Sequence, residues 1–103
     1  MLQASTLQFL KNLKKNNDKQ WFDNNRSAYE AAKEDFATFI NQVIREFGKT
    51  DATIAGLTHR DCLFRINRDV RFSKNKAPYK TNMGASIVAG GKKSPMAGYY
   101  FHL

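Results

Sequence analysis

Residues 25–47, which read NRSAYEAAKEDFATFINQVIREF, decide the fold. Apolar side chains recur there every three or four positions, the spacing that gathers them on one face of an α-helix; they are Tyr29, Ala32, Phe36, Ile40, Val43 and Phe47. Gly48 suits a cap at the C-terminal end. We therefore predict a helix of about 22 residues, from Asn25 to Phe47, with its apolar face in the core.

Two shorter helices are predicted before this one. Either Ser5 or Thr6 can cap the first helix with its side-chain hydroxyl. Asp18 can start the second, a short turn of helix that carries the adjacent aromatic pair Trp21 and Phe22. Because large aromatic side chains stabilise a protein most when they are buried, we expect this pair to anchor the connection to the core.

The spacing changes after the long helix, and the second half of the chain is predicted to form a sheet. Residues 62–66 are predicted as a strand with Phe64 and Ile66 on one face, because successive strand side chains point to opposite faces. Residues 84–89 and 97–103 are predicted as two further strands. The Gly-Gly-Lys-Lys-Ser-Pro sequence between them is typical of a turn and predicts an antiparallel hairpin.

A long loop is predicted over residues 67–82, where charges are frequent and Pro78 lacks the amide that a central strand needs. The fold class is then α+β, with N-terminal helices packed on an antiparallel sheet in one domain over residues 1–103. Because the sequence ends within an apolar strand at Leu103, we expect the sheet to be incomplete and the chain to be the N-terminal part of a longer domain.

Positive charge is concentrated in the second half of the chain. The 103 residues carry a net charge of +8, yet residues 1–58 hold eight bases against seven acids. Residues 59–103 hold nine bases against two acids. An excess of this kind attracts anionic partners such as nucleic acid or phosphorylated metabolites without choosing among them.

The basic loop at residues 64–81 is the candidate binding site, because its arginines recur every three residues and interleave with aromatic side chains. The predicted anion-binding residues are Arg65, Arg68, Arg71, Ser73, Lys74, Lys76 and Lys80, and the predicted stacking residues are Phe72 and Tyr79. Arginine binds phosphates and carboxylates through a planar fork of donors. Cations interleaved with aromatics suit single-stranded nucleic acid, so anion binding, and nucleic acid in particular, is the leading hypothesis.

Three alternatives stay open. In the first, the arginines are an exposed face and the aromatics only pin the loop to the core. In the second, the protein is an enzyme that acts on a phosphorylated or carboxylated small molecule, with Asp69 or His102 as the proton-transfer group. In the third, it is an interaction module whose final strand pairs with a partner, including a second copy in a homodimer.

Other sites have little support in the sequence. The two histidines are far apart and Cys62 has no cysteine partner, so neither a metal site nor a cofactor is predicted. The Gly90-Gly91-Lys92-Lys93-Ser94 run lacks the spacing of a phosphate-binding loop. With a single cysteine, no leader-like start and no long apolar run, the expected location is cytoplasmic, without contact to a membrane.

The stretch FRINRDVRFSKNKAPYKT at residues 64–81 closely resembles the domain of unknown function 2461 family. Further agreement at Phe9-Leu10, Trp21-Phe22 and Gly98-Tyr99-Tyr100 extends the resemblance over nearly the whole chain, with departures at Asn67 and Asn75. The resemblance implies an α+β domain that continues beyond this chain. It transfers no activity, cofactor or catalytic role.

Overall fold

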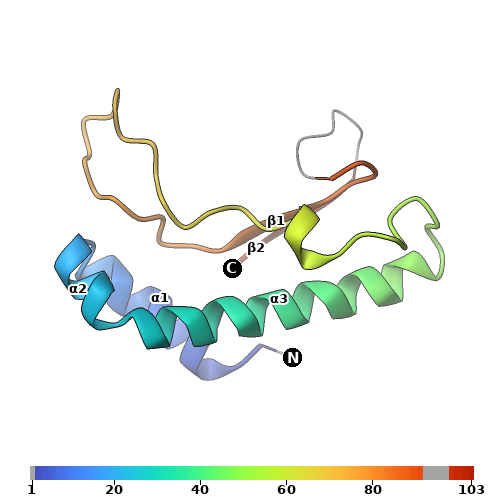
Figure 1. Cartoon of the computed structure of the whole chain (residues 1–103), viewed down its shortest axis with the longest axis horizontal. Coiled ribbons are helices and arrows are strands. Elements are labelled where there is room, and N and C mark those ends of the chain that lie inside the picture. Colours follow the sequence, from blue (N-terminus) through green and yellow to red (C-terminus); the bar gives the residue numbers. More distant parts are fainter. Residues whose placement is uncertain (1, 92–97) are drawn as a thin grey trace.

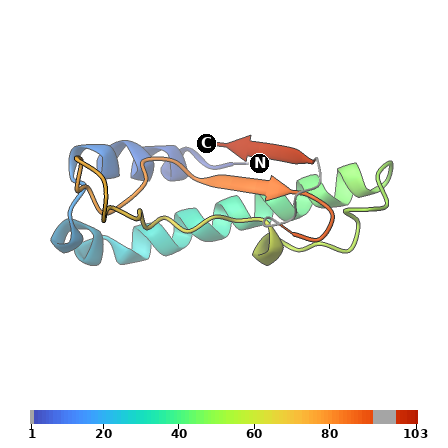
Figure 2. The same ribbon diagram turned by 90° about the horizontal axis from the view of Figure 1, so that it is seen from above.

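The computed structural model of the chain describes residues 2–91 and 98–103, and it confirms the α+β class. The elements follow the chain in this order: α1 (Ala4–Lys15), α2 (Lys19–Asn24), α3 (Arg26–Gly48), the 3-10 helix η1 (His59–Asp61), β1 (Gly84–Ile87) and β2 (Tyr99–His102). Figure 1 shows two layers, with the α-helices on one side and the sheet on the other. Seen from above, α1 runs back along the first part of α3, and the two strands lie further along α3, past the start of α1 (Figure 2).

The long helix α3 holds the core together, as its apolar spacing predicts. Phe36 and Ile40 are almost completely buried, and Ala32 and Ile44 are buried beside them. The predicted stripe is wrong at its C-terminal end, where Phe47 is 37% exposed and Ile44 takes the inward position. Gly48 is the last helical residue, followed by a right-handed Lys49, so the predicted glycine cap is also wrong.

The start of α1 is held by a carboxylate from α3 rather than by its own cap. Asp35 Oδ2 accepts hydrogen bonds from the Gln3 amide at 2.9 Å and from the Thr6 hydroxyl at 2.6 Å. Neither Ser5 nor Thr6 caps the helix, because Gln3 occupies the cap position. The two hydrogen bonds, that from Gln3 first, lower the pKa of the Asp35 carboxyl below its ordinary range.

The short helix α2 begins as predicted, with the Asp18 side chain accepting from the Trp21 amide. Phe22 is buried, while Trp21 packs against the core and stays partly exposed. Phe22 contacts Tyr29, with 4.9 Å between ring centres. The aromatic pair therefore joins α2 to α3 and to the core.

The sheet consists of the antiparallel pair β1 and β2, in a register that pairs Gly84 with His102 and Ile87 with Tyr99. Residues 62–66 do not form the predicted strand. They follow the other edge of β1 through one isolated bridge between Leu63 and Ala85, and Ile66 is already a bend. Because the backbone turns there, Ile66 is buried and Phe64 is exposed, whereas we expected them on one face.

The connection between β1 and β2 includes residues 92–97, so the turn predicted there lies outside the described residues. Gly98 immediately precedes β2. A side chain at this position would overlap Val88 and the Ile87 carbonyl, so the position needs glycine. None of the helices in the described residues combines the length and the apolar character needed to span a membrane.

Candidate anion-binding site

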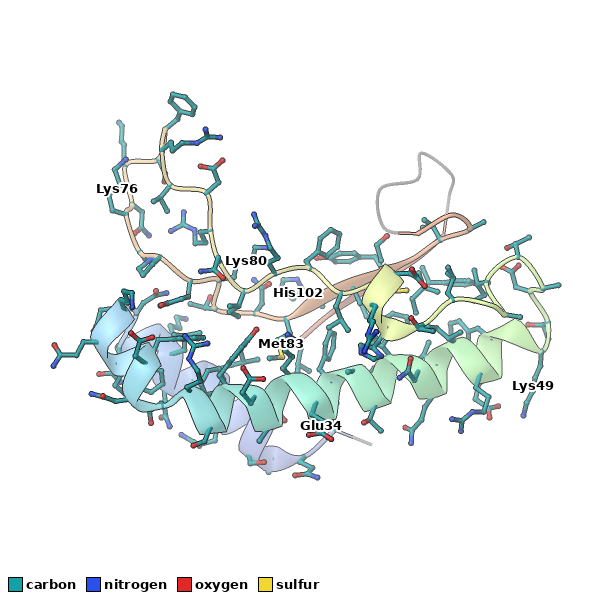
Figure 3. The ribbon with its side chains drawn as sticks, in the orientation of Figure 1. Glu34, Lys49, Lys76, Lys80, Met83 and His102 are labelled. Atoms are coloured by element: carbon teal, nitrogen blue, oxygen red, sulfur yellow. The ribbon has the colours of Figure 1, made fainter. Side chains whose placement is uncertain are left out.

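The basic loop forms a projecting arm, which we define as residues 67–79. Its two sides meet at the bridge between Asn67 and Tyr79, and the Arg68 amide donates to the Pro78 carbonyl at 2.9 Å. Figure 1 shows this yellow-to-orange segment extending away from the sheet and the helices. Lys76 lies on the arm, whereas Lys80 lies where the arm returns to the sheet (Figure 3). The predicted long loop is confirmed.

The cations inside the arm bind its own backbone. Arg68 donates to the carbonyls of Asn75 and Ala77 at 3.4 and 2.9 Å and to the Ser73 hydroxyl at 3.4 Å. Lys76 Nζ donates to the Val70 carbonyl at 2.6 Å. Arg68, Ser73 and Lys76, which were predicted to bind an anion, therefore shape the arm instead of converging on one site.

Lys80 and Lys74 lie in different surroundings. Lys80 Nζ donates to the Arg65 carbonyl at 2.7 Å and lies 5.7 Å from the centre of the Phe64 ring. Lys74 is exposed, and it makes no hydrogen bond or ion pair with the residues that the structure describes. Lys74 is thus the arm cation that is available to a partner.

An ion pair near the tip of the arm joins Arg71 to Asp69. The Arg71 guanidinium donates to both carboxylate oxygens, at 3.1 and 2.9 Å. This hydrogen bonding lowers the pKa of Asp69 below its ordinary value, with a smaller contribution from the charge of Arg65. Both carboxylate oxygens of Asp69 already accept hydrogen bonds from Arg71, which argues against the proton-transfer role considered for Asp69.

The two predicted stacking residues have opposite surroundings. Phe72 is 95% exposed, whereas Tyr79 is 6% exposed. The Tyr79 ring stacks on Phe22 with 4.0 Å between ring centres, and the Asn17 side chain bonds both its amide and its carbonyl. Tyr79 is therefore a core residue at the base of the arm and presents no free face to a ligand.

A cavity of about 550 Å³ lies beside the base of the arm, between α3, η1 and the segment that follows η1. Its lining comprises Tyr29, Lys33, His59, Arg60, Leu63, Phe64, Arg65, Ile66, Asn67, Asn82 and Met83. Met83 lies between the sheet and α3 in Figure 3. Volumes of 300 to 1,000 Å³ are usual for small-molecule sites, so the cavity is large enough for a metabolite.

The cavity is cationic, because three bases and no carboxylate line it. Lys33 comes from α3, Arg60 from η1 and Arg65 from the start of the basic loop. Their side chains form no hydrogen bond or ion pair within residues 2–91 and 98–103. Carboxylates begin in the adjoining groove along α3, which Glu30 and Glu34 line. The cavity therefore offers free donors to an anion.

A hydrogen-bonded pair fixes the orientation of His59 at the cavity wall. The Asn41 Oδ1 atom accepts from the His59 amide at 2.9 Å, which turns the Asn41 Nδ2 group toward His59 Nδ1 at 3.0 Å. An amide NH₂ group can only donate, so Nδ1 accepts this bond and the ring proton is on Nε2. His59 thus has one donor left for a ligand.

Neutral groups complete the cavity. Tyr29 is half-buried, and burial, with a smaller contribution from Glu30, raises the pKa of its hydroxyl. Tyr29 therefore keeps its proton and can donate a hydrogen bond to an anion. Ile66 and Met83 are buried and supply an apolar wall. The lining combines charged donors with apolar surface.

Sequence reasoning found Arg65 and missed Lys33, His59 and Arg60. One indication was present, because Arg60 opens the basic half of the chain. Lys33 follows Tyr29 by four residues and so shares a helix face with it, but nothing in the sequence joins that face to residue 60 or 65. Only the packing of η1 on α3 brings the bases together.

His102 lies on β2, exposed and beside Tyr100, whose ring centre is 6.3 Å away. Neither a hydrogen bond nor an ion pair joins it to Asp69 in the described part of the chain. The outer edge of β2 pairs with no other described strand. Strand pairing with a partner would require such a free edge. A homodimer through this edge stays a prediction.

Metal-binding chemistry has no assembled site among the described residues, where no three His, Cys, Asp or Glu side chains come together. Cys62 is buried.

Residues 5–103 match the sequence model of a family described as "Conserved hypothetical protein (DUF2461)". Searches of curated proteins and of solved structures found no match.

Proposed function

The chain belongs to the DUF2461 family, and we propose that it binds a small anionic molecule in the cavity between α3, η1 and residues 63–67. The observation that carries this proposal is the convergence of Lys33, Arg60 and Arg65 on a cavity with no carboxylate in its lining. Cations brought together without counter-charges repel one another, and a bound anion removes that cost.

The shape of the site supports a small ligand over a polymer. The cavity is framed by elements from three parts of the chain, and its volume of about 550 Å³ matches a metabolite. Arg60 and Arg65 supply the forked donors that suit phosphate or carboxylate. Lys33 adds a point charge from the opposite wall, on α3.

The rest of the lining defines the other part of the ligand. Leu63, Ile66 and Met83 are apolar, and Tyr29 and the His59 Nε2 atom provide single hydrogen-bond donors. A ligand that fits has one acidic group and an apolar or aromatic body. Phosphate monoesters and carboxylates of that kind form the ligand class.

The proposal is for binding, because neither of the side chains considered for proton transfer belongs to the cavity. Asp69 is paired with Arg71 on the arm, and His102 is on β2. An enzymatic role would therefore need a proton-transfer group other than those two.

The test is a calorimetric titration of the whole chain with phenyl phosphate, compared with inorganic phosphate and with phenol. We expect phenyl phosphate to bind most tightly, because it uses both the cations and the apolar wall. Arg65→Ala should weaken this binding by about 10- to 150-fold, the equivalent of about 1.5–3 kcal/mol for a hydrogen bond to a charged group.

The matched control is Lys74→Ala, which removes an equal charge from the arm and should leave the affinity unchanged. Equal losses in Arg65→Ala and Lys74→Ala would show general electrostatic attraction and contradict binding in the cavity. A folded chain that does not bind phenyl phosphate at all would contradict it as well.

A further inference from the structure

The tip of the arm presents an aromatic ring that has no role in the core. Phe72 is 95% exposed, and the Arg71 guanidinium lies over one face of its ring, 5.8 Å from the ring centre. Burial of a phenylalanine side chain contributes about 1.5–3 kcal/mol to folding, and this position forgoes it. The face of the ring opposite Arg71 is therefore available for contact with a partner.

The arm keeps its shape without a partner. Its base is fixed by the two hydrogen bonds between Asn17 and the Tyr79 backbone. Further along, Arg68 bonds the carbonyls of the returning side, and the Ser73 amide closes a turn on the Val70 carbonyl. A preformed element loses less conformational entropy on binding, so even one stacking contact can contribute net affinity.

Charge selects the kind of partner. Residues 68–76 contain four cations and a single carboxylate, a net charge of +3 beside an exposed ring. Lysine is depleted in protein interfaces, so Lys74 and Lys76 make an apolar protein surface a poor fit for this tip. A polymer of phosphates and flat bases supplies both missing components, the anions and the stacking faces.

We propose that the tip of the arm binds single-stranded nucleic acid, with an unpaired base stacked on Phe72 and the adjacent phosphates beside Lys74. Single strands are favoured because the bases of a duplex are already stacked on one another and paired. This site is separate from the cavity, since residues 68–76 contribute nothing to the cavity lining. The two sites can therefore be tested with different variants of the same chain.

The experiment measures fluorescence anisotropy of a labelled single-stranded oligothymidylate, and of a duplex of equal length, with the whole chain over a salt series. We expect the single strand to bind more tightly. Phe72→Ala should weaken that binding by about 5- to 150-fold, the range for stacking of one base, while Phe72→Trp should retain it. Lys74→Ala should reduce the slope of log affinity against log salt by about 0.7, the value of one phosphate contact.

Tyr100→Ala is the matched control, because it removes an aromatic side chain that is 61% exposed on β2 and should leave the affinity unchanged. The proposal is overturned if Phe72→Ala binds like the unchanged chain, or if the duplex binds as tightly as the single strand. It is also overturned if the folded chain binds vesicles containing phosphatidylserine but not the oligonucleotide, a result that would assign the tip to a membrane surface.

Discussion

Two cationic regions of this protein, the arm at residues 67–79 and the cavity beside its base, differ in what their arginine and lysine side chains contact. In the arm, Arg68 and Lys76 donate to backbone carbonyls and Arg71 is paired with Asp69. In the cavity, Lys33, Arg60 and Arg65 have no such partners among the described residues. The density of charge along a sequence therefore does not locate an anion site. What matters is whether the donors already have acceptors.

The largest expected effect separates the base of the arm from its tip. Tyr79→Ala removes a buried ring that stacks on Phe22 and should lower the free energy of unfolding by about 3–5 kcal/mol. Phe72→Ala removes an exposed ring of similar size and should change the free energy of unfolding by less than about 0.5 kcal/mol. Urea denaturation followed by circular dichroism measures both values.

Tyr79→Phe keeps the ring and should remain close to the unchanged protein, so it serves as the control for the packing argument. If Tyr79→Ala and Phe72→Ala had the same stability, the base of the arm would not be packed as described.

A smaller effect distinguishes two arginines that are three residues apart. Arg68→Ala removes donors that hold the two sides of the arm together. Loss of one such hydrogen bond should destabilise the closed arm by about 1 kcal/mol. The amides of residue 68 and of Lys80 should then exchange with solvent about fivefold faster, while those of α3 stay protected. Hydrogen exchange followed by NMR gives the rates.

Arg65→Ala is the counterpart, and it should leave these exchange rates unchanged while it weakens the binding of phenyl phosphate. If Arg65→Ala accelerated exchange in the arm, the distinction between a scaffolding arginine and a ligand-binding arginine would be lost.

The smallest effect concerns the Asp69–Arg71 ion pair at the tip. The pKa of Asp69 is lowered from its ordinary value near 3.8, mainly by hydrogen bonds from Arg71. The pair therefore contributes its stabilisation above that value and loses it as the pH falls through the lowered pKa. Carboxyl NMR titration should find the pKa of Asp69 below 3.8, and Arg71→Ala should return it toward 3.8.

Asp35, whose carboxyl pKa is lowered by hydrogen bonds from Gln3 and Thr6, serves as an internal reference that Arg71→Ala should not affect. An Asp69 titration that is identical with and without Arg71 would mean that the ion pair does not form in solution.

The predictions from sequence succeeded where the backbone repeats a pattern over many residues. The helical spacing between Tyr29 and Ile40 identified α3, and Asp18 marked the start of α2. The predictions failed where the conformation of a short stretch depends on the segments packed around it in space. Residues 62–66 have the composition of a strand, but the chain bends at Ile66 into the arm after one bridge to β1, so a strand cannot extend.

For the candidate site, the sequence identified the basic loop, but it did not show which of the loop's side chains are structural and which are free. Phe72 and Tyr79 looked equivalent in the sequence, and packing against Phe22 made one of them core. Arg65 and Arg68 also looked equivalent, and only Arg68 meets the carbonyls of the returning chain. These distinctions depend on distances across the fold, which a linear pattern does not contain.

The sequence by itself determined the α+β class, the long helix and the concentration of positive charge after residue 58, because helix formation and charge are properties of neighbouring residues. The tertiary structure alone decided which cations are free. Lys33, Arg60 and Arg65 are separated by up to 32 positions in the sequence, and they face one cavity because η1 packs on α3.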